Sequence, residues 1–522
     1  MSSGGSGRHD AEVVIVGAGH NGLVAAGLLA RAGLSVRVLE RRDEVGGFAG
    51  LIELREGMRV PIAADDWGLL RTDLLAELLP ELAASDEPSG GEGELFAVAV
   101  DGRGGAPLPL WRDVARTADE LASRRSSDGP GWRALIAEVT AHGREVEELL
   151  RAEPSFGDLA RTLAKPDLVR ALALPVADRL LAHLQNGPAC AGLATLALAG
   201  SPRGPTAAGT GWLLQAQLAG STATRLRPLR RTTDAGEPFA AVLARAATFH
   251  GARIETGRGV EAVLTERAAG RPPRAVGVRL AGGEEVRCRW VLSNLDPRST
   301  LLGLVGPQAL EVSTLRELRG AKYRGIRSRL LLALEERGLA GAPEGWLGSG
   351  ARLLVGADLR EIDVAADAAK YGRCSERPSI EVFEGPVADG ITALLVDAQW
   401  SPYALRAESG EDGGWQGRAR RGWQEAILAR LEQALPALGE GLLARRLLTP
   451  VDWQSELGAS EGSEHHGETG LEQMFAMRGV PLAGGGPATG IEGLLLCGAG
   501  AHPGGSLTGL PGWHAARAVL RG

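Results

Sequence analysis

The sequence predicts an α/β protein in which a Rossmann-type dinucleotide-binding domain is split along the chain by an inserted α+β domain. Two observations lead to this prediction: a strand–glycine–helix–strand unit at residues 13–47 and a second strand–glycine–helix unit at residues 490–520. The two units lie near opposite ends of a 522-residue chain. A chain of that length is too long for one simple core, so we expect two domains.

The first unit has all parts of a βαβ nucleotide-binding arrangement in order. Residues 13–16 are apolar and predict a buried parallel strand, an Ala/Leu-rich run at 23–32 predicts a helix, and residues 36–39 predict a second strand. The pattern G-x-G-x-x-G stands between strand and helix, and Glu40 follows its last glycine by 18 positions. This spacing is typical of a dinucleotide-binding fingerprint, with a glycine-rich turn of another α/β protein as the alternative.

The three glycines of the fingerprint have different physical roles. Gly17 permits the tight turn, Gly19 lets the backbone approach a pyrophosphate, and Gly22 lets the helix pack closely on the strand. The helix N-terminus offers free N–H groups and a positive dipole end to the phosphates. Glu40 is expected to accept hydrogen bonds from ribose hydroxyl groups.

The residues around Glu40 favour FAD over NAD as the dinucleotide. Arg41 follows Glu40 directly, and the pair Gly46 and Gly47 begins six residues after it. Flavoproteins of the glutathione-reductase and amine-oxidase type carry such a glycine pair, which lets the chain pass close to the FAD phosphates. NAD enzymes usually lack the pair.

The composition excludes several classes of protein. A hydrophobic content of 44% and a charged content of 23% are typical of globular proteins, and a net charge of −7 argues against nucleic-acid binding. Four dispersed cysteines without a C-x-x-C pair indicate neither a redox dithiol nor a zinc site, and they fit a reducing, cytoplasmic location. We expect no metal site, no signal peptide and no transmembrane segment, a disordered stretch at residues 1–10, and at most peripheral contact with a membrane.

Between the two units the pattern changes several times. Residues 66–185 show helical periodicity, and residues 201–236 have the composition of a basic loop. Helices are predicted at Phe239–Phe249 and at 416–434. Strands are predicted at Ala252–Thr256, Val260–Thr265, Ala275–Leu280, Glu285–Cys288, Trp290–Ser293, 328–334 and 392–398.

The second unit begins with a short buried strand, Leu494–Cys497, and a turn at Gly498 and Gly500. A glycine-rich loop follows, and a helix is predicted from near Gly512 to Val519. The unit has no trailing strand and no ribose acid, so we expect it to complete the first domain. The late helix would then point its N-terminus at the flavin C2 carbonyl, where charge gathers on reduction. The alternative is a strand–helix turn that contacts no ligand.

Five stretches of the chain together resemble one family. They are VVIVGAGHNGLVAA at the start, SNLDP at 293–297, SPYALR at 401–406, HHGETGLEQMF at 465–475 and LCGAGAHPGGSLTGLPG at 496–512. These stretches are similar to those of the phytoene-desaturase-like flavoproteins, and within them to the branch named for a pyridine nucleotide-disulphide oxidoreductase domain. The resemblance implies an amine-oxidase-like architecture. It implies an FAD-binding domain built from residues 11–65, 236–305 and 446–522, and a substrate domain built from residues 66–235 and 306–445.

The fingerprint and the resemblance together suggest the cofactor contacts. By the resemblance, Val260 lies beside the adenine as a backbone contact. Two departures are visible: residues 233–238 replace a glycine-rich loop that borders the flavin in relatives, and Trp513–His514 replace an Arg-Asn pair. The residues expected to contact FAD are Gly17, Gly19, His20, Asn21, Gly22, Glu40, Arg41, Gly46, Gly47, Val260, Asn294, Gly498, Ala499, Gly505, Thr508 and Gly509.

His502 is the candidate catalytic residue, because its loop is expected at the edge of the flavin. A structural histidine that bonds the loop backbone is the alternative. His465, His466 and Glu468 form a polar cluster without the spacing of metal ligands. The Arg225–Arg231 run is expected to be a solvated loop, with contact to anionic lipid head groups as the alternative.

The resemblance implies an FAD-dependent oxidoreductase that desaturates or oxidises a hydrophobic, isoprenoid-like small molecule by hydride transfer to flavin N5. The sequence contains no second complete nucleotide-binding unit, so electrons are expected to pass to oxygen, a quinone or another diffusible acceptor. Two alternatives stay open. One is a flavin-binding protein with weakened catalysis that acts through a partner, and the other is a flavin amine oxidase.

Overall fold

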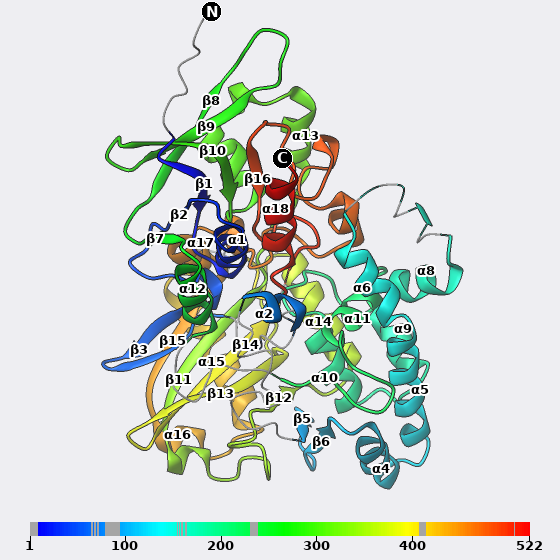
Figure 1. Ribbon diagram of the computed structural model, residues 1–522. Coiled ribbons are helices and arrows are strands. Elements are labelled where there is room, and N and C mark those ends of the chain that lie inside the picture. Colours follow the sequence, from blue (N-terminus) through cyan, green and yellow to red (C-terminus); the bar gives the residue numbers. More distant parts are fainter. Residues whose placement is uncertain are drawn as a thin grey trace, which may run out of the picture.

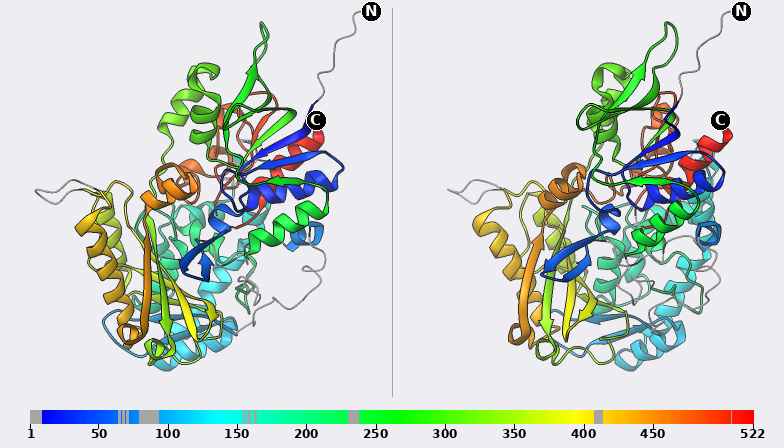
Figure 2. Two further views of the ribbon diagram at one scale, coloured as in Figure 1. Left: turned by 90° about the vertical axis from the view of Figure 1, so that its left-hand side faces the viewer. Right: turned by 60° about the vertical axis from the view of Figure 1, so that its left-hand side comes forward.

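Two seven-stranded sheets organise the chain, and a layer of helices packs beside the second sheet (Figure 1). Figure 2 shows the first sheet together with both termini at one end of the molecule and the second sheet at the other end. The computed structural model describes residues 9–63, 66, 69, 72–78, 94–153, 155, 157, 160–161, 164–229, 238–406, 414–505 and 507–522. Residues 1–8 of the stretch expected to be disordered, and residues 233–237 of the departing loop, lie outside this part of the chain.

The first sheet has the strand order β7-β2-β1-β10-β9-β8, with β16 also paired to β10. The strands β7, β2, β1, β10 and β16 run parallel where they pair with one another, and the apolar run of β1 is almost wholly buried. Helices α1, α12 and α18 pack on one face of this sheet. The strands are β1 (Ala11–Val16), β2 (Val36–Leu39), β7 (Arg253–Glu255), β8 (Val260–Glu266), β9 (Arg274–Leu280), β10 (Glu285–Ser293) and β16 (Leu494–Leu496).

Strand β10 is continuous, whereas the sequence pattern predicted two strands at Glu285–Cys288 and Trp290–Ser293. Its first residues, Glu285–Arg287, pair antiparallel with β9. From Cys288 onward the strand pairs parallel with β1. A change of partner, and not a turn, therefore interrupts the alternation of side chains that suggested a break.

The second sheet has the order β15-β11-β14-β13-β12-β5-β6. Strands β5 and β6 lie inside residues 66–185, for which helical periodicity was predicted throughout. Every residue of β5 is buried, so its continuous apolar run carries no period that separates a strand from a helix. The strands are β5 (Leu95–Val100), β6 (Leu108–Trp111), β11 (Arg327–Glu335), β12 (Arg352–Val355), β13 (Ile380–Ala388), β14 (Ile391–Gln399) and β15 (Leu442–Leu448).

Helix α15 packs on one face of the second sheet, and most of the other helices between β6 and β14 form the adjoining layer. The predicted basic loop at 201–236 contains a helix, α11. The described helices are α1 (His20–Arg31), α2 (Thr72–Leu78), α4 (Val114–Arg124), α5 (Asp128–Ala141), α6 (Gly143–Arg151), α8 (Pro166–Ala173), α9 (Val176–Leu181), α10 (Pro188–Ala197), α11 (Gly211–Gln217), α12 (Phe239–Phe249), α13 (Val312–Gly320), α14 (Leu359–Lys370), α15 (Gly417–Glu432), α16 (Leu438–Gly441), α17 (Pro450–Leu457) and α18 (Leu510–Arg521).

A hairpin of β3 (Leu51–Arg55) and β4 (Met58–Pro61) follows β2 of the first sheet along the chain and packs against the second sheet. Met58 and Val60 pack in one core with Leu331 and Leu395 of the second sheet. The end of the predicted first FAD segment, residues 11–65, therefore lies against the second sheet. The limits of the two domains stay a prediction.

Candidate functional site

A groove, called here the nucleotide groove, opens at the carboxyl ends of β1, β2 and β10. The strand ends are tied by the main chain, because Gly17 N donates to Leu39 O at 2.8 Å and Asn294 N donates to Val16 O at 2.9 Å. Crevices at such strand ends are where open α/β sheets bind ligands. The predicted contact residues that line this groove are Gly17, Gly19, His20, Asn21, Glu40, Arg41, Gly46, Gly47, Val260, Asn294 and Ala499.

The groove also has a lining that the sequence analysis did not assign to the cofactor. Val16, Leu39, Arg42 and Phe48 lie in or directly after the 13–47 unit, Leu295 and Asp296 lie in the SNLDP stretch, and His466 lies in the HHGETG stretch. The others come from segments without a motif of their own. The additional residues are Val16, Leu39, Arg42, Phe48, Gly259, Leu295, Asp296, Leu457, Gly458, Glu464 and His466.

The fingerprint glycines stand where a side chain would collide with neighbouring atoms. Gly17 has a φ of +94°, which disfavours a side chain. A Cβ on Gly19 would lie 2.5 Å from Asn294 Nδ2, and one on Gly22 would lie 2.5 Å from the carbonyl oxygen of Gly17. The turn is thus compact enough to bring main-chain N–H groups to the floor of the groove.

Glu40 is held rigidly at the end of β2. Its Oε2 accepts a hydrogen bond from Ala18 N at 2.8 Å, and its Oε1 accepts one from Arg42 N at 2.9 Å. Each carboxylate oxygen has a second lone pair, so the fixed side chain can also accept from ribose hydroxyl groups. The side chain thus couples the conformation of the fingerprint turn to ribose binding.

The residues present fit a dinucleotide. The groove offers ≈ 980 Å³ of space, counting its open mouth, which suits a cofactor of this size. The twelve-residue helix α1 begins at the groove, and Asn21 Oδ1 beside it is buried without a hydrogen-bond partner in the described part of the chain. The helix N-terminus and the glycine turn offer N–H donors to a pyrophosphate, and the carboxylate of Glu40 offers acceptors to the ribose hydroxyl groups.

Five predicted contacts do not line the groove: Gly22, Gly498, Gly505, Thr508 and Gly509. Gly498 lets the end of β16 approach, since a Cβ there would lie 2.5 Å from Asn294 O. A Cβ on Gly505 would lie 2.8 Å from His465 Nδ1, and Gly509 has a φ of +71° directly before α18. Thr508 Oγ1 accepts from Leu510 N at 3.4 Å. These residues shape the C-terminal loop around the groove.

His502 lies away from the groove lining. Its side chain is 1% exposed, its ring meets that of His514 at a centroid distance of 5.2 Å, and burial lowers its pKa to about 3. A neutral, buried ring of this kind is a packing element at neutral pH. Its role as a catalytic residue, proposed from the sequence, stays a prediction that this geometry does not favour.

The segment Glu464–His466 runs along the groove. His466 lines it, and burial lowers the pKa of His466 to about 4. Burial likewise lowers the pKa of His465, whose Nε2 lies 3.2 Å from the carbonyl oxygen of Ala199. Both rings are therefore neutral near pH 7, and Glu464 is the acidic side chain of this segment.

Arg478 holds the segment and the C-terminal loop together. Its guanidinium donates to the carbonyl oxygens of Ala499, at 2.8 and 3.1 Å, of Glu468, at 2.7 Å, and of His465. The side chain is buried, and burial lowers its pKa to about 10. Arg478 thus positions Ala499 at the groove without lining it.

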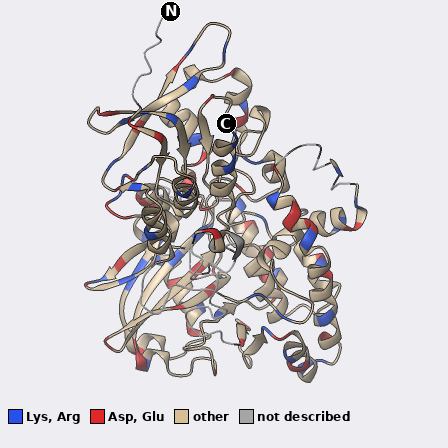
Figure 3. Cartoon of the chain, viewed as in Figure 1, with Lys and Arg blue, Asp and Glu red and all other residues tan. Residues whose placement is uncertain are grey.

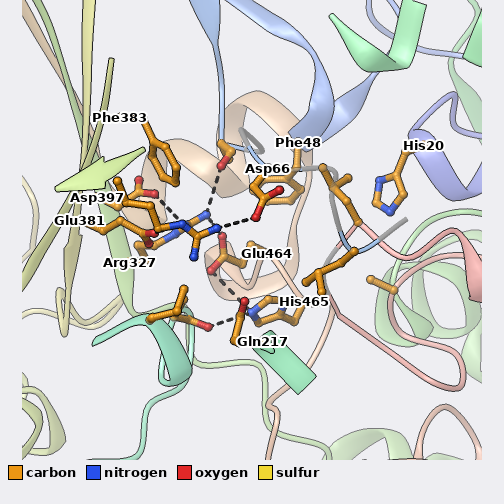
Figure 4. A pocket seen from close by; sticks show the side chains of 17 residues that line it. His20, Phe48, Asp66, Gln217, Arg327, Glu381, Phe383, Asp397, Glu464 and His465 are labelled. Atoms are coloured by element: carbon orange, nitrogen blue, oxygen red, sulfur yellow. Dashed lines mark hydrogen bonds and ion pairs between the residues drawn. The ribbon is translucent and has the colours of Figure 1, made fainter. Parts of the chain in front are cut away.

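A second cavity adjoins the nucleotide groove (Figure 4). It lies between the start of α1, strands β11, β12, β13 and β14 of the second sheet, and the ends of α10 and α11. Four residues, His20, Phe48, Glu464 and Ala499, line both spaces, which are therefore adjacent. The other residues that line the second cavity are Ala63, Asp66, Leu69, Leu196, Ala199, Gln217, Arg327, Arg352, Glu381, Phe383, Asp397, His465 and Leu507.

The basic run at Arg225–Arg231 is only partly solvated over its described length. Arg227 is 2% exposed and donates to Asp66 at 2.6 Å, so its side chain is used inside the protein. Arg225 is exposed, as predicted for a solvated loop, and pairs with Glu94 at 2.7 Å. Arg230 and Arg231 lie outside the described residues.

Glu468, a member of the predicted polar cluster, lines neither the groove nor the second cavity. Its carboxylate accepts a hydrogen bond from Arg324 Nη2 at 2.8 Å. Among the described residues, no group of three potential metal ligands is found, and no helix is long and apolar enough to span a bilayer. Acidic and basic residues are interspersed over the described part of the chain (Figure 3).

Comparison with known proteins agrees with this geometry. Residues 15–65 match the family described as NAD(P)-binding Rossmann-like domain. The fold is that of cyclohexylamine oxidase from Brevibacterium oxydans, with a TM-score of 0.55 at 16% identity over 98% of each chain. The predicted fold class is confirmed. Fold and groove together define the class of protein: an FAD-dependent oxidoreductase.

The likeness to individual proteins extends over the whole chain. The chain is 27% identical to pyridine nucleotide-disulfide oxidoreductase domain-containing protein 2 of Rattus norvegicus, over 100% of this chain and 95% of that protein. It is also 27% identical to hydroxyneurosporene desaturase of Rhodobacter capsulatus over 98% of each. The predicted resemblance to phytoene-desaturase-like flavoproteins is confirmed.

Proposed function

We propose that the protein is an FAD-dependent dehydrogenase that holds its cofactor in the nucleotide groove and its organic substrate in the second cavity. The observation that carries the proposal is the adjacency of the two spaces, which share Phe48, Glu464 and Ala499 in their linings. A substrate in the second cavity would then lie next to a cofactor held in the groove.

FAD, when bound, supplies the acceptor for a hydride at flavin N5. The chain's own residues supply the rest of the site. Gly17, Gly19 and the start of α1 would hold the pyrophosphate, and Glu40 the ribose. Glu464 stands where the two spaces meet and can hold a proton released by the substrate.

The electron acceptor follows from the class of enzyme and stays part of the proposal. Oxygen, a quinone or another diffusible acceptor would reoxidise the cofactor, and a quinone would make peripheral contact with a membrane useful. The relative named hydroxyneurosporene desaturase motivates a hydrophobic, isoprenoid-like substrate, and the amine-oxidase fold motivates an amine.

The test is to purify the protein and record its visible spectrum before and after acid precipitation. The expected result is flavin released into the supernatant and identified as FAD by mass spectrometry. The reason is that the sequence shows no obvious site of covalent attachment beside the predicted flavin position. Binding of NAD(H) with no flavin would contradict the proposal.

A flavin-binding protein with weakened catalysis is the second candidate. It is favoured by the departure at residues 233–238, five of which lie outside the described residues. Anaerobic bleaching of the flavin by added substrate would support the dehydrogenase. A bound flavin that no substrate reduces, although dithionite does, would favour the second candidate.

A further inference from the structure

One face of the second sheet changes character along its strands. On the side covered by the β3–β4 hairpin, Leu331 is paired with Leu395 across β11 and β14. Two residues further along the same face, Arg329 is paired with Asp397. Glu381 stands beside Asp397 on β13. The apolar part of this face is buried by the hairpin, and the charged part faces the second cavity.

The charged part is a balanced network. Asp397 accepts from Arg329 Nε at 2.7 Å and from Arg327 Nη1 at 2.8 Å. Asp66 accepts from Arg227 and Arg352, and Glu381 lies 3.4 Å from Arg352 Nε. Arg327 also pairs with Glu464. The network joins four carboxyl side chains to four guanidinium side chains: Asp66, Glu381, Asp397 and Glu464, and Arg227, Arg327, Arg329 and Arg352.

Two atoms beside this cavity are not used in the ion pairs of the network. Arg327 Nε is buried without a hydrogen-bond partner in the described part of the chain, although its Nη atoms are used. Glu464 Oε1 lies 3.7 Å from His465 Nε2, which is beyond hydrogen-bond distance, while its Oε2 faces Arg327. A donor from Arg327 and an acceptor from Glu464 thus stand on one wall (Figure 4).

We infer that the second cavity selects a small polar substrate, which offers an oxygen acceptor to Arg327 and a hydroxyl or ammonium donor to Glu464, rather than a polyene hydrocarbon. The inference rests on the proposed function and names its substrate class.

The physical reason is desolvation. A hydrocarbon in this cavity would displace water from charged side chains and return no hydrogen bond, which is costly for buried polar groups. A small substrate with an acceptor next to a donor replaces the water and satisfies Arg327 Nε. Because the network is already neutral, a ligand without net charge, a zwitterion included, disturbs it least.

The test measures binding with named probes. Ethanolamine and L-serine are the polar probes, and phytoene in detergent is the apolar probe. Binding is followed by the change in the visible flavin spectrum and, on the same samples, by the melting temperature. The variants are R327K, which keeps a charge for Asp397 and Glu464 but lacks Nε–H, and the control R337K. Arg337 is 65% exposed and pairs only with its neighbour Glu335 among the described contacts.

We expect a polar probe to shift the spectrum saturably and to raise the melting temperature, while phytoene does neither. R327K should raise the Kd of that probe about tenfold or more, as for one hydrogen bond to a charged group, and R337K should leave it unchanged. Binding of phytoene alone, no binding of either polar probe, or an unchanged Kd in R327K would each overturn the inference. If the protein carries no flavin, the proposed function fails, and the melting temperatures still decide what the cavity binds.

Discussion

The nucleotide groove and the second cavity meet at Glu464, yet they manage charge in opposite ways. The fingerprint side of the groove consists largely of main chain, with glycines, a helix N-terminus and the fixed carboxylate of Glu40. One wall of the cavity consists of guanidinium and carboxylate side chains that pair with one another. The backbone suits a cofactor of constant shape, because its N–H groups are placed by the fold itself. Side-chain ions suit a substrate that differs between relatives, because they can be exchanged without changing the fold.

The largest expected effect comes from acid, and it tests whether His466 of the nucleotide groove and the buried His502 must stay uncharged. Burial lowers the pKa of His466 from 6.5 to about 4 and that of His502 from 6.5 to about 3. Between pH 6.5 and these values the unfolded chain binds protons that the folded chain does not. The free energy of unfolding should therefore fall as the pH falls through this window, by about 1.4 kcal/mol per pH unit for each histidine.

Urea unfolding above and within this window measures the effect. The variants H466Q and H502Q should each flatten the pH dependence, whereas H9Q, at an exposed position, should not. Equal slopes in all four proteins would show that these two buried rings are not what links stability to pH.

Asp397→Ala should damage the cavity more than the groove. It removes the carboxylate that Arg327 and Arg329 share, and it leaves two buried cations without this partner. The expected loss is about 3–5 kcal/mol in the free energy of unfolding. Chemical denaturation measures it, with D367A as the control, since Asp367 is exposed and pairs with Lys370. A loss of stability no larger than that of D367A would mean that the network tolerates a missing charge.

Glu40→Ala should damage the groove and spare the cavity. The loss of a charge-assisted hydrogen bond to ribose is expected to cost about 1.5–3 kcal/mol, roughly ten- to a hundredfold in FAD affinity. Fluorescence titration of the apoprotein with FAD measures the affinity, and circular dichroism checks the fold. Because Glu40 also accepts from Ala18 N, E40Q is the matched variant that keeps one acceptor. Unchanged affinity in E40A would place the ribose elsewhere.

Gly22→Ala gives the smallest expected effect and tests whether the groove depends on close packing of α1. The added Cβ would lie 2.5 Å from the carbonyl oxygen of Gly17, a main-chain atom that cannot rotate away. Overpacking of this kind costs about 1–3 kcal/mol. G143A is the control, because no atom lies within 4 Å of a Cβ there. Thermal melting of both variants with and without FAD measures the difference, and equal melting temperatures would refute the packing role of Gly22.

The fingerprint side of the groove could be predicted from the sequence alone, because the fingerprint is local. Gly17, Gly19 and Glu40 lie within one βαβ unit, where spacing along the chain becomes spacing in space. The helix Phe239–Phe249 and the strand Val36–Leu39 were predicted with the bounds that the structure has, since each carries a clear apolar pattern and a clear end.

The second cavity could not be predicted from the sequence, because the fold alone brings its residues together. Arg327, Asp397, Asp66 and Glu464 come from four separate segments, and no pattern within any one of them marks its side chain as buried and paired. The same holds for β5, whose burial on both faces erased the period, and for β10, which changes partner at Cys288. Periodicity records how one element faces one neighbour. Where a strand is buried on both faces, or where ions from distant strands meet, the neighbour is defined only by the folded chain.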